Sequence, residues 1–238
     1  MTIKAVLFDK DGTLIDFMGT FGPATARVIE SLANGDTVLA QALADAVDFN
    51  ISTLKVDLNS VLIAGSLENI VRDFAVVIKQ PYSNELLAHV DDLFVKFSVE
   101  SLYPFSFTET ALDALLNMGL ILGVATNDSE TGALAHLNKL KISDRFRFIA
   151  GYDSGHGAKP EPGMVAAFIT QFNLQPEDVM MVGDSTHDLT AGRAASAISV
   201  AVTSGEAQAV DLAPFADHVL ENISQLPALI RTLNESRS

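Results

Sequence analysis

The sequence predicts an α/β fold, in which a Rossmann-like, doubly wound parallel sheet is interrupted after its first strand by an inserted helical domain. Two observations predict it. Short apolar runs alternate with helical patterns over the C-terminal half of the chain, which is typical of a parallel sheet covered by helices on both faces. The first apolar run, residues 3–8, is followed instead by a long block with helical periodicity.

The predicted elements can be placed in chain order. Apolar residues at three- and four-residue spacing predict inserted helices at residues 24–32, 38–47, 67–78 and 85–99. After this block we predict strands at residues 120–125, 146–151, 179–182, 198–202 and 218–220, and helices at 108–118, 130–140, 164–172, 189–195 and 226–233.

Helix-breaking residues mark the edges of the insertion. Gly19, Gly22 and Pro23 are predicted to break the chain before the helical block, and Tyr103-Pro104 closes it. We therefore predict a catalytic core at residues 1–16 and 100–238, and an inserted domain at residues 17–99. With 238 residues, 48% of them hydrophobic, the chain is long enough for both parts.

Composition limits the class of protein. The chain has no cysteine, which excludes disulfides and thiolate chemistry. No apolar run approaches the length of a membrane-spanning helix, and acidic residues follow residues 3–8 before a signal peptide could form, so we expect a soluble, cytoplasmic protein without a membrane partner. The net charge of −15 disfavours a nucleic-acid partner, although a metal and a few lysines could still attract a small anionic substrate.

Polar residues follow three of the predicted strands. Asp9 and Asp11 follow the first, within the sequence FDKDGTL that also contains Gly12. Two other strand ends carry Thr126 with Asn127, and Asp184 with Asp188. Ligands of such sheets bind beyond the carboxyl ends of the strands. The convergence favours a binding site over the alternative, a simple Asp-Gly turn.

The residue types at these strand ends suit a phosphate ester. Asp9 and Asp184 can offer carboxylate oxygens to Mg²⁺, and Asp188 could bind the ion through water or hold the other ligands. Thr126 and Asn127 are suited to grip phosphoryl oxygens.

Each of these residues also has a plain structural interpretation. Asp184 and Asp188 could cap a helix, as could the residues after Thr126, where Asp128 or Ser129 would serve. Lys159, in the sequence GAKPEPG, suits a fixed positive charge near the phosphate, but it could also be an ordinary surface lysine.

The sequences FDKDGTL, VATND, GAKPEPG and VGDSTHD, in this order, resemble the four motifs of the haloacid dehalogenase-like hydrolase superfamily. The inserted domain resembles the helical cap of one subclass. The resemblance implies that Asp9 is the nucleophile and that Asp11 is the acid and base, whose carbonyl also binds Mg²⁺. It further implies that the residues binding the phosphoryl group are Gly12, Thr126, Asn127 and Lys159. The metal ligands that it implies are Asp9, Asp11, Asp184 and Asp188.

The expected substrate is a small phosphorylated metabolite, because the chain most resembles phosphoglycolate phosphatases. Ser66, in a predicted turn of the cap, is expected to contact it. Lys10 also occurs in such phosphatases, and we expect it to be solvent-facing or structural. The alternatives are a sugar- or nucleotide-directed phosphatase, a phosphomutase, a phosphonatase or a phosphate-binding protein without activity. We expect a monomer or homodimer.

Overall fold

The computed structural model describes residues 2–56 and 60–236. The chain forms two compact units, one made of residues 1–16 and 104–238 and the other of residues 17–103. The predicted second boundary, between residues 99 and 100, falls inside helix α5 (Asn84–Glu100). Residues 1, 57–59 and 237–238 of the predicted domains lie outside the described residues.

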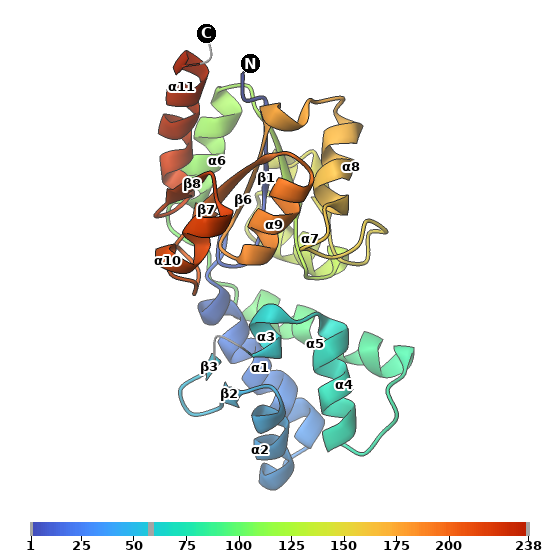
Figure 1. Cartoon of the computed structure of the whole chain (residues 1–238). Coiled ribbons are helices and arrows are strands. Elements are labelled where there is room, and N and C mark those ends of the chain that lie inside the picture. Colours follow the sequence, from blue (N-terminus) through green and yellow to red (C-terminus); the bar gives the residue numbers. More distant parts are fainter. Residues whose placement is uncertain (1, 57–59, 237–238) are drawn as a thin grey trace. The chain divides into compact units, whose positions relative to one another are not determined.

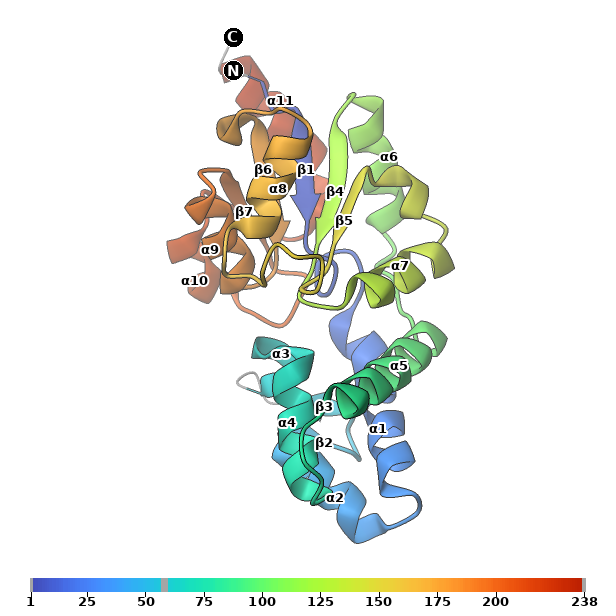
Figure 2. The same cartoon turned by 90° about the vertical axis from the view of Figure 1, so that its right-hand side faces the viewer.

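The larger unit is built on a parallel sheet with the strand order β5-β4-β1-β6-β7-β8 (Figures 1 and 2). Strand β1 lies at the centre, between β4 and β6, with Phe8 in register with Val124 and Val182. The α/β prediction is confirmed. The strands are β1 (Ala5–Phe8), β4 (Ile121–Ala125), β5 (Phe148–Ala150), β6 (Val179–Gly183), β7 (Ile198–Val202) and β8 (His218–Leu220).

Helices cover both faces of this sheet. Helices α8 (Gly163–Gln171) and α9 (Thr186–Ala194) lie on one face, whereas α6 (Thr108–Asn117) and α11 (Leu226–Ser236) lie together on the other (Figures 1 and 2). Every residue of β1 is buried, because its side chains meet helices on either side. The remaining helical elements of this unit are α7 (Glu130–Lys139), α10 (Ala209–Leu212), η1 (Ser143–Arg145), η2 (Pro176–Asp178), η3 (Ala213–Phe215) and η4 (Ile223–Gln225).

The smaller unit is mainly helical and has its own apolar core, which includes Val28, Leu43, Phe74 and Val90. Its elements are α1 (Phe17–Ala33), α2 (Thr37–Ala46), α3 (Val61–Ala64), α4 (Leu67–Val77), α5 and a short antiparallel pair, β2 (Phe49–Asn50) with β3 (Lys55–Val56). The helices predicted at residues 38–47, 67–78 and 85–99 were found within one residue of their expected ends, whereas α1 begins seven residues before the predicted start at residue 24. The strand pair and α3 were not predicted.

The expectation that Gly19, Gly22 and Pro23 break the chain was wrong, because all three lie inside α1. Tertiary packing explains Gly22. A Cβ atom there would lie 2.6 Å from the carbonyl oxygen of Leu54, so the glycine lets the β2–β3 loop approach the helix closely. Packing of this kind outweighs the low helix propensity of glycine.

None of the helices in the described part of the chain is long and apolar enough to cross a membrane.

Candidate active site at the carboxyl end of the central strands

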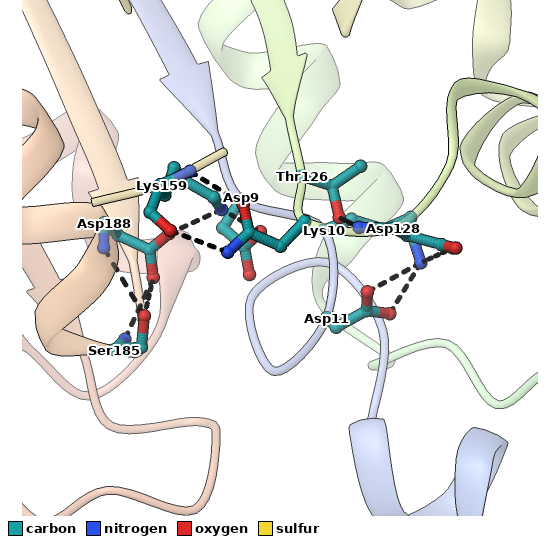
Figure 3. A network of polar contacts seen from close by, with 9 residues as sticks. Asp9, Lys10, Asp11, Thr126, Asp128, Lys159, Ser185 and Asp188 are labelled. Carbon is teal, nitrogen blue, oxygen red and sulfur yellow. Dashed lines mark hydrogen bonds and ion pairs between the residues drawn. The ribbon is translucent and has the colours of Figure 1, made fainter. Parts of the chain in front are cut away.

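The three polar strand ends that the sequence singles out are neighbours in the sheet. Strands β4, β1 and β6 lie side by side and run in the same direction, so Thr126, Asp9 and Asp184 emerge at one edge. Lys159 joins them from the loop between β5 and α8 (Figure 3). Residues up to 175 positions apart in the sequence therefore converge, as expected for a site at the carboxyl ends of parallel strands.

Lys159 lies between two carboxylates, those of Asp9 and Asp188, and the three side chains form a first cluster. Its Nζ donates to Oδ1 of Asp9 at 2.5 Å and to Oδ1 of Asp188 at 2.6 Å, and all three side chains are buried. The alternative of a surface lysine was therefore wrong. The side chain of Asn127 clamps the backbone of Lys159, since its Oδ1 accepts from the Lys159 N–H (2.8 Å) and its Nδ2 donates to the Lys159 carbonyl (2.9 Å).

Asp188 caps a helix, which is one of the roles considered for it, and it also pairs with Lys159. It forms a capping box at the start of α9, in which the Ser185 Oγ accepts from the Asp188 N–H while Oδ2 of Asp188 accepts from the N–H and hydroxyl of Ser185. Its other oxygen accepts from Lys159. Ser185 was missed in the sequence, although S-x-x-D is a recognisable capping pattern.

Asp184 lies in a niche beside two glycines that leave no room for a side chain, Gly12 and Gly205. A Cβ on Gly12 would lie 2.1 Å from Oδ2 of Asp184, and a Cβ on Gly205 would lie 1.8 Å from the same atom. Gly12 also has a φ of +74°, which favours glycine. The hydroxyl of Ser204 donates to the Gly12 carbonyl at 2.7 Å and so ties the loop after β7 to this niche. Ser204 and Gly205 were missed because only three strand ends were considered.

The donor set fits a hard divalent cation. Asp9, Asp184 and Asp188 each offer a carboxylate oxygen, and these oxygens lie within 4.8 Å of one another. Oxygen-only ligands of this kind suit Mg²⁺.

The raised pKa values of the carboxyl groups in this cluster also favour a bound cation. Burial raises the pKa of Asp9 to about 7, against the lowering effect of Lys159, with Asp188 and Asp11 adding to the rise. Burial and repulsion from Asp9 and Asp188 also raise the pKa of Asp184. These three carboxylates share one ammonium group, so they lack positive charge that a metal ion would supply.

Thr126 lies at the end of β4, next to the start of α7. Its Oγ1 accepts from the backbone N–H of Asp128 at 3.1 Å, a bond that does not use the hydroxyl hydrogen. Ser129, rather than Thr126 or Asn127, is the N-cap of α7, since its side chain accepts from the Gly132 N–H. The threonine hydroxyl is therefore not needed to cap the helix.

Asp11 belongs to a second cluster, which meets the first at the end of β1 (Figure 3). Nζ of Lys10 lies 2.7 Å from both carboxylate oxygens of Asp11 and 3.0 Å from Oδ2 of Asp128. Lys10 is completely buried, so the expectation of a solvent-facing side chain was wrong and the structural one holds. The two carboxylates explain how a buried ammonium group is accommodated there.

Ser66 lies in the smaller unit and is a helix cap. Its Oγ accepts from the Asn69 N–H at 3.4 Å, at the start of α4. Its predicted contact with substrate stays a prediction.

The comparison with known proteins identifies the family. The family model of haloacid dehalogenase-like hydrolases matches residues 3–196, which is most of the chain. The chain belongs to this family. Two curated relatives of the hydrolase are a phosphoglycolate phosphatase of Neisseria meningitidis, 30% identical over 85% of this chain and 81% of its own length, and an N-acetylmuramic acid 6-phosphate phosphatase of Pseudomonas aeruginosa, 26% identical over 86% and 84%.

A solved structure shows the same fold. The haloacid dehalogenase-superfamily hydrolase, subfamily IA, of Geobacter sulfurreducens aligns with a TM-score of 0.63 over 96% of each chain, at 18% identity. Family membership and the curated relatives together indicate that this hydrolase is a phosphatase.

Proposed function

We propose that the protein is a Mg²⁺-dependent phosphoric monoester hydrolase that forms an aspartyl-phosphate on Asp9 and acts on a small phosphorylated acid, of which phosphoglycolate is the first candidate. The observation that carries this proposal is the convergence of Asp9, Lys159, Asp184 and Asp188 at the ends of adjacent strands. The name of the Neisseria relative supports the substrate.

Asp9, Asp184 and the backbone carbonyl of Asp11 would hold the metal, with Asp188 binding it directly or through water. When bound, Mg²⁺ neutralises the negative charge of the phosphate and of the surrounding carboxylates. The side chain of Asp11 contacts Lys10, which leaves its backbone carbonyl for this role.

The reaction proceeds in two steps. An oxygen of Asp9 attacks phosphorus, the bond from phosphorus to the leaving oxygen breaks, and that oxygen takes a proton from the carboxylic acid of Asp11. Water then gives a proton to the Asp11 carboxylate and attacks phosphorus, and the bond from Asp9 to phosphorus breaks. Lys159, the hydroxyl of Thr126 and the N–H group of Asn127 would stabilise the charge that develops on the phosphoryl oxygens. The N–H of Gly12 already donates to the Ile15 carbonyl at 2.8 Å, so Gly12 would contribute by leaving space in the loop instead.

A phosphate-release assay over metabolite esters tests the proposal. With Mg²⁺ present, the protein should hydrolyse p-nitrophenyl phosphate and should prefer phosphoglycolate among esters of comparable size. Absence of turnover on every ester would favour a phosphate-binding protein without activity.

A sugar phosphate is the second candidate, because the name of the Pseudomonas relative gives a phosphorylated sugar acid as its substrate. N-acetylmuramic acid 6-phosphate therefore belongs in the same panel. A higher kcat/KM on it than on phosphoglycolate would move the assignment to sugar phosphates, while leaving the chemistry of Asp9 unchanged.

A further inference from the structure

Lys10, which has no role in the proposed chemistry, lies at the centre of a network of charged and polar side chains. Its Nζ contacts the Asp11 carboxylate at 2.7 Å, Oδ2 of Asp128 at 3.0 Å and Nδ1 of His136 at 3.0 Å. Lys10 has no exposed surface and His136 has 1%. Figure 3 shows the carboxylate of Asp11 turned toward Lys10 and Asp128.

The chemistry of the groups fixes the direction of each bond. An ammonium group has three N–H donors and no acceptor, so Nδ1 of His136 must accept. Burial, with Lys10 nearby, lowers the pKa of His136 to about 3, which keeps the ring neutral and able to accept. Hydrogen bonds thus join Lys10 to both oxygens of Asp11 and to His136, and Asp128 adds an ion pair at 3.0 Å.

Two of these partners lie in α7 or just before it. His136 is a buried residue of this helix, and Asp128 precedes it, with Oδ1 accepting from the Ser129 N–H at 2.8 Å. The backbone N–H of Asp128 donates to Thr126 at the end of β4. The helix and the neighbouring strand therefore fix the position of the ammonium group. Its contact with Asp11 in turn restrains the Asp11 carboxylate.

We propose that Lys10, anchored by Asp128 and His136, is a positioning residue that fixes the Asp11 carboxylate for proton transfer to the leaving oxygen. The proposal rests on the acid and base role of Asp11 in the proposed function. A short carboxylate on a turn has several rotamers, and a misplacement of about 1 Å in a catalytic group can cost on the order of 100-fold in rate. A two-oxygen contact with an anchored ammonium group removes that freedom.

A comparison of leaving groups separates this role from general damage to the fold. An alkoxide leaving group needs the proton of Asp11, whereas p-nitrophenolate leaves without one. We expect Lys10→Met to lower kcat on phosphoglycolate about 100-fold. Release of p-nitrophenolate in a single turnover, with enzyme in excess, should stay within about threefold of wild type. Equal losses in both assays, or a change of less than threefold in both, would overturn the proposal.

Lys4→Met is the matched control. Lys4 also pairs with a buried carboxylate, that of Asp178 at 2.6 Å, but it lies at the opposite end of β1. This variant should match wild type in both assays.

His136 provides a second test should Lys10→Met fold poorly. Asn and Leu have similar shapes, and the amide oxygen of Asn can occupy the place of Nδ1. His136→Asn keeps an acceptor for Lys10 and should remain within about threefold of wild type, whereas His136→Leu should lose about tenfold on phosphoglycolate alone. Equal behaviour of the two variants would count against the proposal.

Asp11→Asn distinguishes a failure of the positioning role from a failure of the proposed function. It should show the same dependence on the leaving group, and more strongly. If Asp11→Asn shows this dependence and the Lys10 and His136 variants do not, only the positioning role is wrong. If Asp11→Asn affects both leaving groups equally, its assigned role and the positioning role are both wrong.

Discussion

Replacement of Gly205 by alanine should displace Asp184 and thereby weaken the proposed metal site. The added Cβ would lie 1.8 Å from Oδ2, 2.6 Å from Cγ and 2.8 Å from Cβ of Asp184. Non-bonded heavy atoms are most stable at about 3.5–4.0 Å, so the carboxylate must move by more than about 1 Å. A change of side-chain rotamer cannot relieve the clash fully, because the Cβ of Asp184 is itself too close.

The size of the effect follows from this displacement. Loss of the supporting contacts of a metal site typically costs 10–100-fold in metal affinity, which corresponds to about 1.4–2.7 kcal/mol. We expect the Mg²⁺ concentration at half-maximal activity to rise by 10–100-fold, and kcat at saturating Mg²⁺ to fall about 100-fold. A phosphate-release assay titrated with Mg²⁺ measures both, and calorimetry measures Mg²⁺ binding without turnover.

Gly119→Ala is the control for this variant. Gly119 follows α6, has a φ of +79° and has no atoms within 4 Å of an added Cβ. Alanine there strains the backbone by about 1 kcal/mol or more but does not touch the carboxylates. It should therefore lower the melting temperature and leave the Mg²⁺ dependence unchanged. A Gly205→Ala variant with the kcat and the Mg²⁺ dependence of wild type would refute the assignment of Asp184.

Four further predictions concern the same site. Asp9→Asn should abolish phosphate release at any Mg²⁺ concentration, and activity near wild type would remove Asp9 as the nucleophile. EDTA should stop turnover and added Mg²⁺ should restore it; turnover that persists in EDTA would contradict the metal assignment. Lys159→Met should destabilise the Mg²⁺-free protein by about 3–5 kcal/mol in urea unfolding, because it leaves buried carboxylates unpaired; an unchanged midpoint would show that the pairs are not formed. Burial raises the pKa of Asp9 from 3.8 to about 7, so the folded protein holds a proton on Asp9 that the unfolded chain has lost. The Mg²⁺-free protein should therefore lose stability as the pH rises through about 7. Stabilisation by Mg²⁺ should grow between pH 6 and pH 8, and a stabilisation that stays constant would argue against this.

The order of the motifs and the strand ends were predictable because they depend on local patterns. A parallel sheet aligns the carboxyl ends of its strands, so polar residues after three apolar runs had to converge once β4, β1 and β6 were neighbours. The spacing of apolar residues likewise located the helices of both units. Residues that depend on contacts distant in sequence were not predictable in this way. The helical conformation at Gly22 depends on Leu54, and the niche at Gly205 depends on Asp184.

Lys10 shows the same limit more sharply. Its neighbours in the sequence, Asp9 and Asp11, suggested only that a lysine stood between two acids. Its burial depends on His136 and Asp128, more than 110 residues further along the chain. A fully buried lysine is rare without a carboxylate partner, so only the tertiary structure could reveal that this one has two.

The two buried lysines divide the acidic side chains of the site into unequal groups. Lys159 faces Asp9 and Asp188, with Asp184 beside them, so one positive charge serves three carboxylates. Lys10 faces the carboxylates of Asp11 and Asp128. The first group has the greater excess of negative charge, so a divalent cation would be attracted to it rather than to the second. Such a division keeps Asp11 beside a resident ammonium group while Asp9 lies beside the proposed metal. Two carboxylates two residues apart on the same strand end can thus take different roles, attack on phosphorus and proton transfer, because each has its own source of positive charge.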